Sequence, residues 1–105
     1  MSVQVERAPV LEDDVQLDPP WHVILLDDND HSYDYVIQML GSIFGYGPEK
    51  SFALARIVDT QGRVIVFTGN HDKALTHQEK IHNYGADPLI PRCKGSMSAL
   101  VEPAG

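Results

Sequence analysis

The 105-residue sequence contains only one cysteine, Cys93, and no long hydrophobic run. A single cysteine excludes an internal disulfide and favours a reducing compartment, so we expect a cytoplasmic protein. A membrane-spanning helix needs roughly 20 consecutive apolar residues, and no segment approaches that length. The first residues also lack the cationic start and apolar stretch of a signal peptide. The sequence therefore predicts no membrane association.

Basic residues are also scarce, with 8 Lys and Arg against 15 Asp and Glu and a net charge of −7. Proteins that bind phosphate backbones carry a basic surface, so we predict no nucleic-acid partner. The chain has no glycine-rich phosphate loop, serine elbow or paired catalytic carboxylates, which argues against an enzyme and against a cofactor. Cys93 has no base nearby in the sequence and is a weak candidate nucleophile.

The histidines near the end of the chain do not predict a metal site. His71, His77 and His82 are spaced by six and five residues, so a helix would not bring any two of them within chelating reach. We expect all three to be solvated polar positions.

The most informative stretch runs from Trp21 to Leu40. An apolar run over 23–26 is typical of a buried strand, and five polar residues follow it over 27–31. Ser32 stands at the N-cap position of a helix whose apolar residues recur at helical spacing from Tyr33 to Phe44. The sequence thus predicts a strand, an acidic corner and an amphipathic helix.

The rest of the chain predicts a small α+β sandwich of three helices on a three-stranded antiparallel sheet, in the order β-α-α-β-α-β. Residues 1–20 are interpreted as a flexible acidic tail, and residues 21–105 as the folded domain. Gly45 and Gly62 are placed after helices, and Asn70 is placed as a helix cap. The predicted strands are 22–27, 63–68 and 97–102, the predicted helices are 33–44, 48–59 and 71–84, and 86–95 is a loop. In the second helix, we expect Phe52, Leu54, Ala55, Ile57 and Val58 to form the buried side.

The acidic corner, residues 27–31, has three interpretations. It is a plain turn, because Asp and Asn tolerate turn geometry and cap helices. It is a cation site, although a calcium loop would need glycine where Tyr33 stands, and a magnesium-holding phospho-receiver domain would need five strands. Alternatively, the carboxylates hold the α-ammonium group of a peptide while its side chain enters an apolar pocket.

At residues 21–104 the chain resembles the ClpS family of adaptors for Clp-type AAA+ proteases. The resemblance is carried by Val23-Ile24-Leu25-Leu26-Asp27-Asp28-Asn29, by Tyr35-Val36-Ile37 with Leu40, by Gln61-Gly62 before the strand RVIVFT, and by the terminal strand from Met97 to Ala104. It implies a preformed pocket that binds the N-terminal residue of N-degron proteins. It also implies docking on the N-terminal domain of a Clp-type AAA+ unfoldase, with the tail engaging the protease.

The resemblance also implies which residues form the pocket. The α-amino group would be held by Asp27, Asp28 and Asp59, and the side-chain pocket would be lined by His31, Tyr33, Val36, Ala55, Val58 and Met97. Several of these depart from the family pattern, since Asp27 replaces Asn, Asp59 replaces His, His31 replaces Thr, and Tyr33 and Ala55 each replace Met. The loop from Asp87 to Gly95 is longer than the family norm, and its Arg92 and Lys94 have no assigned role.

We therefore predict a non-enzymatic adaptor that delivers substrates to a Clp protease, by their N-terminal residue, without metal or other cofactor. One alternative is a paralogous interaction module that keeps the fold but does not bind N-degrons, because adjacent carboxylates repel one another. The other alternative is a metal-binding switch at the acidic corner.

Overall fold

The computed structural model describes residues 19–28 and 30–105. Most of the predicted flexible tail, and Asn29, lie outside these residues, so the division into a tail and a domain stays a prediction. The elements are β1 (Trp21–Leu26), α2 (Tyr33–Phe44), α3 (Pro48–Gln61), β2 (Arg63–Gly69), α4 (His71–His82) and β3 (Ala99–Pro103). Their order and type confirm the predicted fold class.

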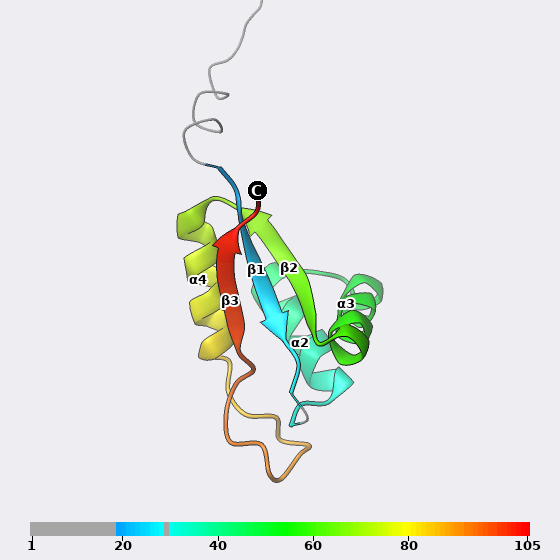
Figure 1. Cartoon of the computed structure of the whole chain (residues 1–105). Coiled ribbons are helices and arrows are strands. Elements are labelled where there is room, and N and C mark those ends of the chain that lie inside the picture. The colour runs from blue at the N-terminus through cyan, green and yellow to red at the C-terminus, as the bar shows by residue number, and fades with distance from the viewer. Residues whose placement is uncertain (1–18, 29) are drawn as a thin grey trace, which may run out of the picture.

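The three strands form one antiparallel sheet in the order β2-β1-β3 (Figure 1). Helices α2 and α4 lie behind the sheet, and α3 lies to the side of β2. The acidic corner between β1 and α2 and the long loop between α4 and β3 are at the same end of the molecule. This arrangement brings segments together that are about 60 residues apart in sequence.

Capping groups set most of the element boundaries. Ser32 begins α2, because its hydroxyl accepts the backbone N–H of Tyr35 at 3.1 Å. Asn70 begins α4 in the same way, accepting the N–H of Lys73 at 2.8 Å. After α2, Gly45 adopts the left-handed conformation with φ of 74°, which glycine reaches without a steric penalty. The cap at the end of α4 is Asn83, so this helix ends two residues before the predicted Tyr84.

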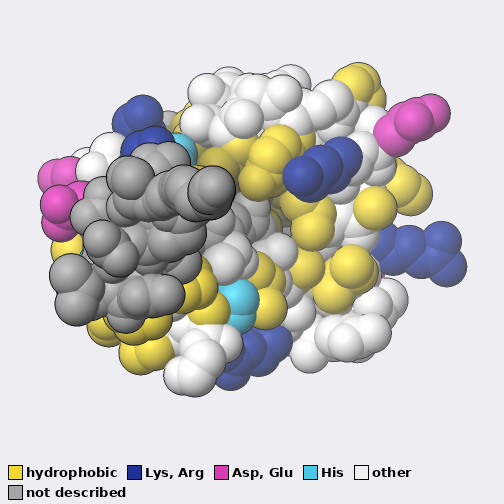
Figure 2. All heavy atoms as spheres, turned by 90° about the horizontal axis from the view of Figure 1, so that it is seen from above, with side chains coloured by type: hydrophobic (Ala, Val, Ile, Leu, Met, Phe, Trp, Pro, Cys, Tyr) yellow, Lys and Arg dark blue, Asp and Glu magenta, His cyan; other side chains and the backbone are white. Residues whose placement is uncertain are grey.

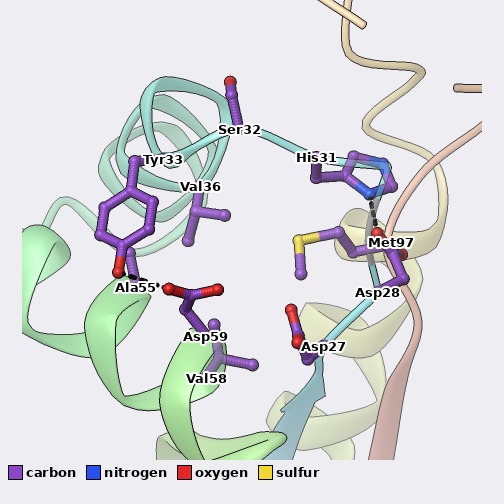
Figure 3. Close-up of a pocket in the computed structure, with 10 residues that line it drawn as sticks. All are labelled: Asp27, Asp28, His31, Ser32, Tyr33, Val36, Ala55, Val58, Asp59 and Met97. Atoms are coloured by element: carbon purple, nitrogen blue, oxygen red, sulfur yellow. Dashed lines mark hydrogen bonds and ion pairs between the residues drawn. The ribbon is translucent and has the colours of Figure 1, made fainter.

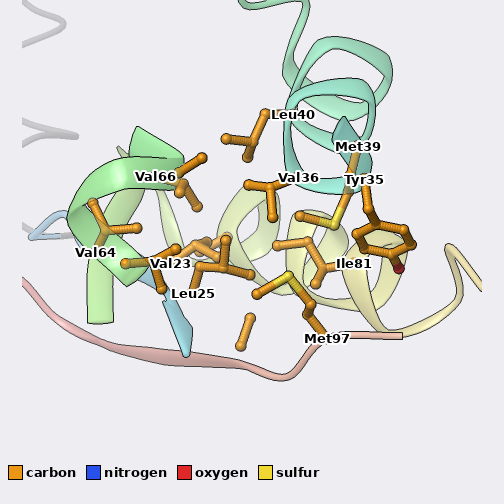
Figure 4. Packing of buried hydrophobic residues seen from close by; sticks show 14 residues of the cluster. Val23, Leu25, Tyr35, Val36, Met39, Leu40, Val64, Val66, Ile81 and Met97 are labelled. Carbon is orange, nitrogen blue, oxygen red and sulfur yellow. The ribbon is translucent and has the colours of Figure 1, made fainter. Parts of the chain in front are cut away.

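The core fills the space between the sheet and the helices (Figure 4). The inner face of the sheet and the inward sides of α2 and α4 supply its largest side chains, including Val23, Leu25, Val64, Val66, Tyr35, Val36, Met39, Leu40 and Ile81. The prediction for α3 was wrong in part, because Phe52 and Ile57 are 47% and 38% exposed. Only one narrow stripe of α3 is buried, since this helix lies at the edge of the sheet; it consists of Ser51, Ala55 and Val58.

The expectation of solvated histidines on the last helix was wrong in part, because His71 and His77 are half-buried and only His82 is exposed. His77 is half-buried between the rings of Phe44 and Phe67, with ring centroids 4.6 and 4.5 Å away. Burial, together with the nearby charges of Lys80 and Lys73, lowers the pKa of His77. His71 stacks on Trp21 with 3.9 Å between ring centroids. This end of the molecule, seen in Figure 2, shows hydrophobic side chains with basic and His side chains among them.

His82 has a structural role at the free edge of β3. Its Nε2 accepts the backbone N–H of Ala99 at 3.0 Å, and the side chain of Gln78 donates to the carbonyl of the same residue at 2.9 Å. Just before β3, the carbonyl of Ser98 accepts the N–H of Leu26 in β1, so the backbone groups of Ala99 point outward. Two side chains of α4 therefore satisfy the outward-pointing backbone groups at the start of this edge.

Candidate functional site

A pocket of about 180 Å³ lies between the acidic corner, α3 and the segment that leads into β3 (Figure 3). The structure brings together all nine residues that the sequence predicts for the site, and adds Ser32. The lining residues are Asp27, Asp28, His31, Ser32, Tyr33, Val36, Ala55, Val58, Asp59 and Met97. Their functional roles stay predictions, but they share one pocket.

The local fold explains why these side chains converge. The end of β1 is held on both sides by backbone hydrogen bonds of 3.0 Å. The N–H of Leu26 donates to the carbonyl of Ser98, and the N–H of Asp27 donates to the carbonyl of Gly62. The corner then turns through Asp28, whose side chain accepts the backbone N–H of Asp30 at 2.9 Å. On α3, residues 55, 58 and 59 are spaced by three and four positions, so they face the same side of the helix.

The acidic part of the pocket is formed by Asp27 and Asp59, whose carboxylates face it from opposite sides (Figure 3). Partial burial, the negative charge of Asp59 and that of Asp28 raise the pKa of Asp27. Among the described lining residues none is Lys or Arg. This is a site where a positively charged ligand group would relieve repulsion between carboxylates.

The hydroxyl of Tyr33 donates a hydrogen bond to Oδ2 of Asp59 at 2.8 Å. This bond raises the pKa of Tyr33, since the carboxylate favours the neutral phenol. It also means that one lone pair of Asp59 already has a donor in this structure.

The apolar part of the pocket is formed by Val36, Ala55, Val58 and Met97, each at most 4% exposed. Figure 3 shows the thioether of Met97 reaching toward the centre from the side opposite α3. The pocket thus combines carboxylates with an adjoining apolar wall, so a ligand suited to it carries an ammonium group beside a hydrophobic side chain.

His31 lines the pocket but turns its polar atoms away from it. Its side chain is 3% exposed. Nδ1 lies 2.6 Å from Oδ1 of Asp28, and Nε2 lies 2.8 Å from the carbonyl oxygen of Gly95. Both ring nitrogens therefore have an oxygen partner in the corner or in the loop, and neither is directed at the pocket. Oδ1 of Asp28 is therefore occupied, and a ligand would contact its Oδ2.

The loop 86–95 does not line the pocket, but it holds the acidic corner in place through contacts that sequence reasoning missed. Asp87 is only 2% exposed, and its carboxylate accepts the backbone N–H of Ser32 at 2.6 Å and that of Leu89 at 2.9 Å. Burial alone would raise the pKa of Asp87, but these bonds and the nearby His31 outweigh it and lower the pKa. The sequence of this segment predicted only a loop and carried no sign of a buried carboxylate.

Two further residues of this loop contact the acidic corner. Arg92 pairs with Asp30, with 2.7 Å between Nε and Oδ1. The sulfur of Cys93 lies 3.3 Å from Nε2 of His31. The loop is thus tied to the corner by buried and exposed contacts together.

Within residues 19–28 and 30–105, no group of three or more His, Cys, Asp or Glu side chains is arranged to hold a metal ion. The metal-switch alternative therefore gains no support from the described part of the chain. In the same residues, none of the helices combines the length and hydrophobicity needed to span a bilayer.

The described residues form a small α+β domain whose pocket combines carboxylates with apolar side chains, and comparison with known proteins defines its class. The family model described as "ATP-dependent Clp protease adaptor protein ClpS" matches residues 16–89. The chain is 32% identical over 84 residues to the ClpS adapter of Rhodococcus jostii, covering 80% of this chain and 75% of the relative. It is 30% identical over 86 residues to the ClpS adapter of Corynebacterium efficiens, covering 74% and 85%.

Among solved structures, the chain is similar to Agrobacterium tumefaciens ClpS2 bound to L-phenylalaninamide. The TM-score is 0.68 at 19% identity, covering 80% of this chain and 95% of the other, so this likeness concerns the fold. The family-model match covers most of the described domain. The chain belongs to the ClpS family, the adaptors of the ATP-dependent Clp protease.

Proposed function

We propose that this adaptor binds N-degron proteins by their N-terminal residue and presents them to a Clp-type AAA+ unfoldase. The α-ammonium group would lie between Asp27, Asp28 and Asp59, and the first side chain would enter the apolar part of the pocket. One observation carries the proposal: a single pocket places three carboxylates beside a buried apolar wall. The pKa of one of these carboxylates, Asp27, is raised.

The chemistry of a similar protein's ligand supports the proposal. L-phenylalaninamide, bound in Agrobacterium ClpS2, has a free α-amino group next to a bulky apolar side chain. A peptide that begins with a large apolar residue presents the same two groups. In this chain Asp27 and Asp59 would hold the ammonium by charge-assisted contacts, which are stronger than those of neutral groups.

The energetics require both halves of the pocket. Burying a large apolar side chain contributes about 1.5–3 kcal/mol, whereas micromolar affinity needs about 8 kcal/mol. The carboxylate contacts and backbone contacts of the peptide must supply the difference. Removing either carboxylate should therefore have a large effect on binding.

The downstream partner is proposed to be the N-terminal domain of the unfoldase, in the cytoplasm, with the acidic N-terminal segment engaging the protease. The membership of the chain in an adaptor family supports an ATPase partner. Co-purification of the full chain with isolated unfoldase N-domains, monitored by analytical size exclusion, tests this part separately from peptide binding.

The test of peptide binding is fluorescence anisotropy with peptides that begin with Phe, Leu, Trp, Tyr or Ala, each with a free or an acetylated N-terminus. We expect bulky free N-termini to bind and acetylated ones not to bind. Asp27→Ala and Asp59→Ala should weaken binding at least about tenfold, the loss of one charge-assisted contact. The matched control is Asp72→Ala, at an exposed position of α4 outside the pocket, which should bind as the wild type does.

A second candidate function is favoured by the contacts that the acids already make. Asp59 accepts from Tyr33, and Asp28 accepts from His31, so part of the corner is satisfied without a ligand. On this alternative, the protein is an interaction module that regulates the ATPase without reading N-termini. Absence of binding to every peptide by the folded protein would favour this alternative over N-degron recognition.

A further inference from the structure

The outer face of the sheet, which is turned away from α2 and α4, takes no part in the core or in the pocket (Figure 1). On this face Ile24, in the central strand, has Ile65 of β2 and Leu100 of β3 as its direct cross-strand partners. Ile24 is 2% exposed but lies outside the core cluster, whereas Ile65 and Leu100 are 48% and 42% exposed. These three side chains form the apolar row, a continuous line across all three strands.

An apolar row is not what the solvent-facing side of an antiparallel sheet normally carries, because polar side chains alternate there with the inward-facing apolar ones. Helix α3 extends the apolar surface, since Leu54 and Ile57 border a groove of about 410 Å³ beside Ile24 and Ile65. Within residues 19–28 and 30–105, no helix lies over this face, and α3 reaches only its β2 side. A contiguous exposed apolar surface of this kind marks a place where another surface packs.

The charged side chains beside the apolar row carry both signs. Arg63 of β2 and Glu102 of β3 form an ion pair of 3.5 Å, and both side chains are about half exposed. Arg63 is the cross-strand partner of Leu26. Glu102 is the partner of His22, on the other side of Ile24, so the two charged residues flank the apolar row. An apolar centre with a polar rim is the usual composition of a protein–protein interface.

This distribution of charge suits a second copy of the same chain. The chain carries a net charge of −7, so two copies repel each other in most orientations. The outer face differs from the rest, because its cation and its anion balance. A two-fold axis that passes through Ile24 and exchanges the two charged corners places Arg63 of each copy against Glu102 of the other. The two apolar rows then cross at Ile24.

We propose that the outer face of the sheet is a self-association surface, on which a second copy of this chain packs its own apolar row about a two-fold axis. Neighbouring strands are about 4.8 Å apart, so three strands and the side of α3 offer less than the roughly 800 Å² per partner of a standard interface. The dimer is therefore weak, with an expected dissociation constant of roughly 10 μM to 1 mM. The groove and the pocket share no lining residue, so this association does not depend on the proposed function.

Sedimentation velocity of the full chain, from about 10 μM to 1 mM, measures the association. We expect the weight-average mass to rise from that of the monomer toward that of the dimer. Leu100→Lys should weaken association at least about tenfold, because it places a charge in the apolar row of each copy. The matched control is Leu89→Lys, at a 63% exposed position of the loop 86–95 outside this face, which should associate as the wild type does. Circular dichroism verifies that both variants are folded.

The charged corners give a second test, which leaves the apolar row intact. Arg63→Glu and Glu102→Arg should each weaken self-association, because each variant carries two like charges on the face. An equimolar mixture of the two variants should restore a dimer that contains one chain of each kind. Neither chain regains the ion pair within itself, so this restoration reports contacts between chains.

A folded chain that stays monomeric at about 1 mM would overturn the proposal. A dimer that persists in folded Leu100→Lys, or a mixture of the two charge variants that stays monomeric, would overturn it as well. Protection of Ile65 and Leu100 from hydroxyl-radical labelling in a monomeric protein would do the same, because it would assign the face to residues 1–18 instead.

Discussion

The hydroxyl of Tyr33, in the first turn of α2, donates to the carboxylate of Asp59, near the end of α3, across 2.8 Å. The ring of Tyr33 also packs on Phe52 with 5.6 Å between centroids. The two helices that border the pocket are thereby joined at its rim. A ligand ammonium that binds Asp59 must share this carboxylate with the phenol.

The first prediction concerns the ionisation of Tyr33. Because the bond to Asp59 raises the pKa of Tyr33, Asp59→Asn should lower that pKa toward the ordinary value for tyrosine. The contribution of the bond to stability is present at neutral pH and is lost as the pH rises through the raised pKa. Phenolate absorbance, taken as the difference from Tyr33→Phe, measures the change. Asp34→Asn is the control, and an unchanged titration in Asp59→Asn would contradict the prediction.

The second prediction separates stability from binding at Asp27. Burial and the neighbouring acids raise the pKa of Asp27, so its ionised form disfavours folding at neutral pH, and this cost disappears as the pH falls through the raised pKa. Asp27→Asn should leave the free energy of unfolding unchanged or raise it by about 0.5 kcal/mol, because the side chain is mostly exposed and solvent screens its repulsion with the other acids. Asp27→Ala, which also removes the acceptor oxygens, should bind N-terminal peptides more weakly. Thermal melting at neutral pH and anisotropy measure the two effects, and a clear loss of stability would contradict this account.

The third prediction is that the ionised carboxylate of Asp87 stabilises the fold, whereas that of Asp27 disfavours it. Since hydrogen bonds from Ser32 and Leu89 lower the pKa of Asp87, its ionised form stabilises the fold. This stabilisation is present above the unfolded pKa, about 3.9, and is lost as the pH falls through the lowered folded value. Asp87→Asn should lower the free energy of unfolding at neutral pH by about 1.5–3 kcal/mol, the value of hydrogen bonds to a charged group. Urea denaturation at neutral and acid pH measures it.

The control for Asp87 is Asp34→Asn, at an exposed position of the same end of the molecule. This variant should change the free energy of unfolding by no more than about 0.5 kcal/mol. Equal effects of the two substitutions would mean that the buried bonds of Asp87 contribute nothing specific.

The fourth prediction tests how α4 is anchored. Ile81 is fully buried, whereas Leu75 on the same helix is 43% exposed. Ile81→Ala should lower the free energy of unfolding by about 2–5 kcal/mol, because it removes buried methyl groups and leaves a cavity. Leu75→Ala should change it by at most about 0.5 kcal/mol. Chemical denaturation of the two variants gives the comparison, and similar losses would show that α4 packs differently.

The elements were predictable where local chemistry sets them. Ser32, Asn70 and Gly45 cap helices through groups within four residues, so their roles can be seen in the sequence. The end of α4 was less predictable, because Asn83 ends the helix before Gly85. Only a narrow stripe of α3 is buried because the helix lies at the edge of the sheet, and the apolar pattern of a helix does not show where that helix packs.

The residues that line the pocket were predicted from the family resemblance. The contacts of the loop 86–95 with the acidic corner could not be predicted in this way. A resemblance transfers positions that the family shares, such as Val36 and Met97. It carries no information on a loop that is longer than the family norm, so the bonds of Asp87 and the contact between Cys93 and His31 became visible only in the folded chain. The bond between Ser32 and Asp87 and the contact between Cys93 and His31 join residues more than 50 positions apart.

The capped edge of β3 has a consequence for the polypeptide that a bound N-terminus would bring with it. Because His82 and Gln78 occupy the outward N–H and carbonyl of Ala99, and Pro103 has no N–H, this strand offers few backbone groups for pairing. Met97, which lines the pocket, lies two residues before that strand. Under the proposed function, a substrate that leaves the pocket on this side would meet a sheet edge with few free backbone groups, and its following residues would stay unpaired and accessible to the unfoldase.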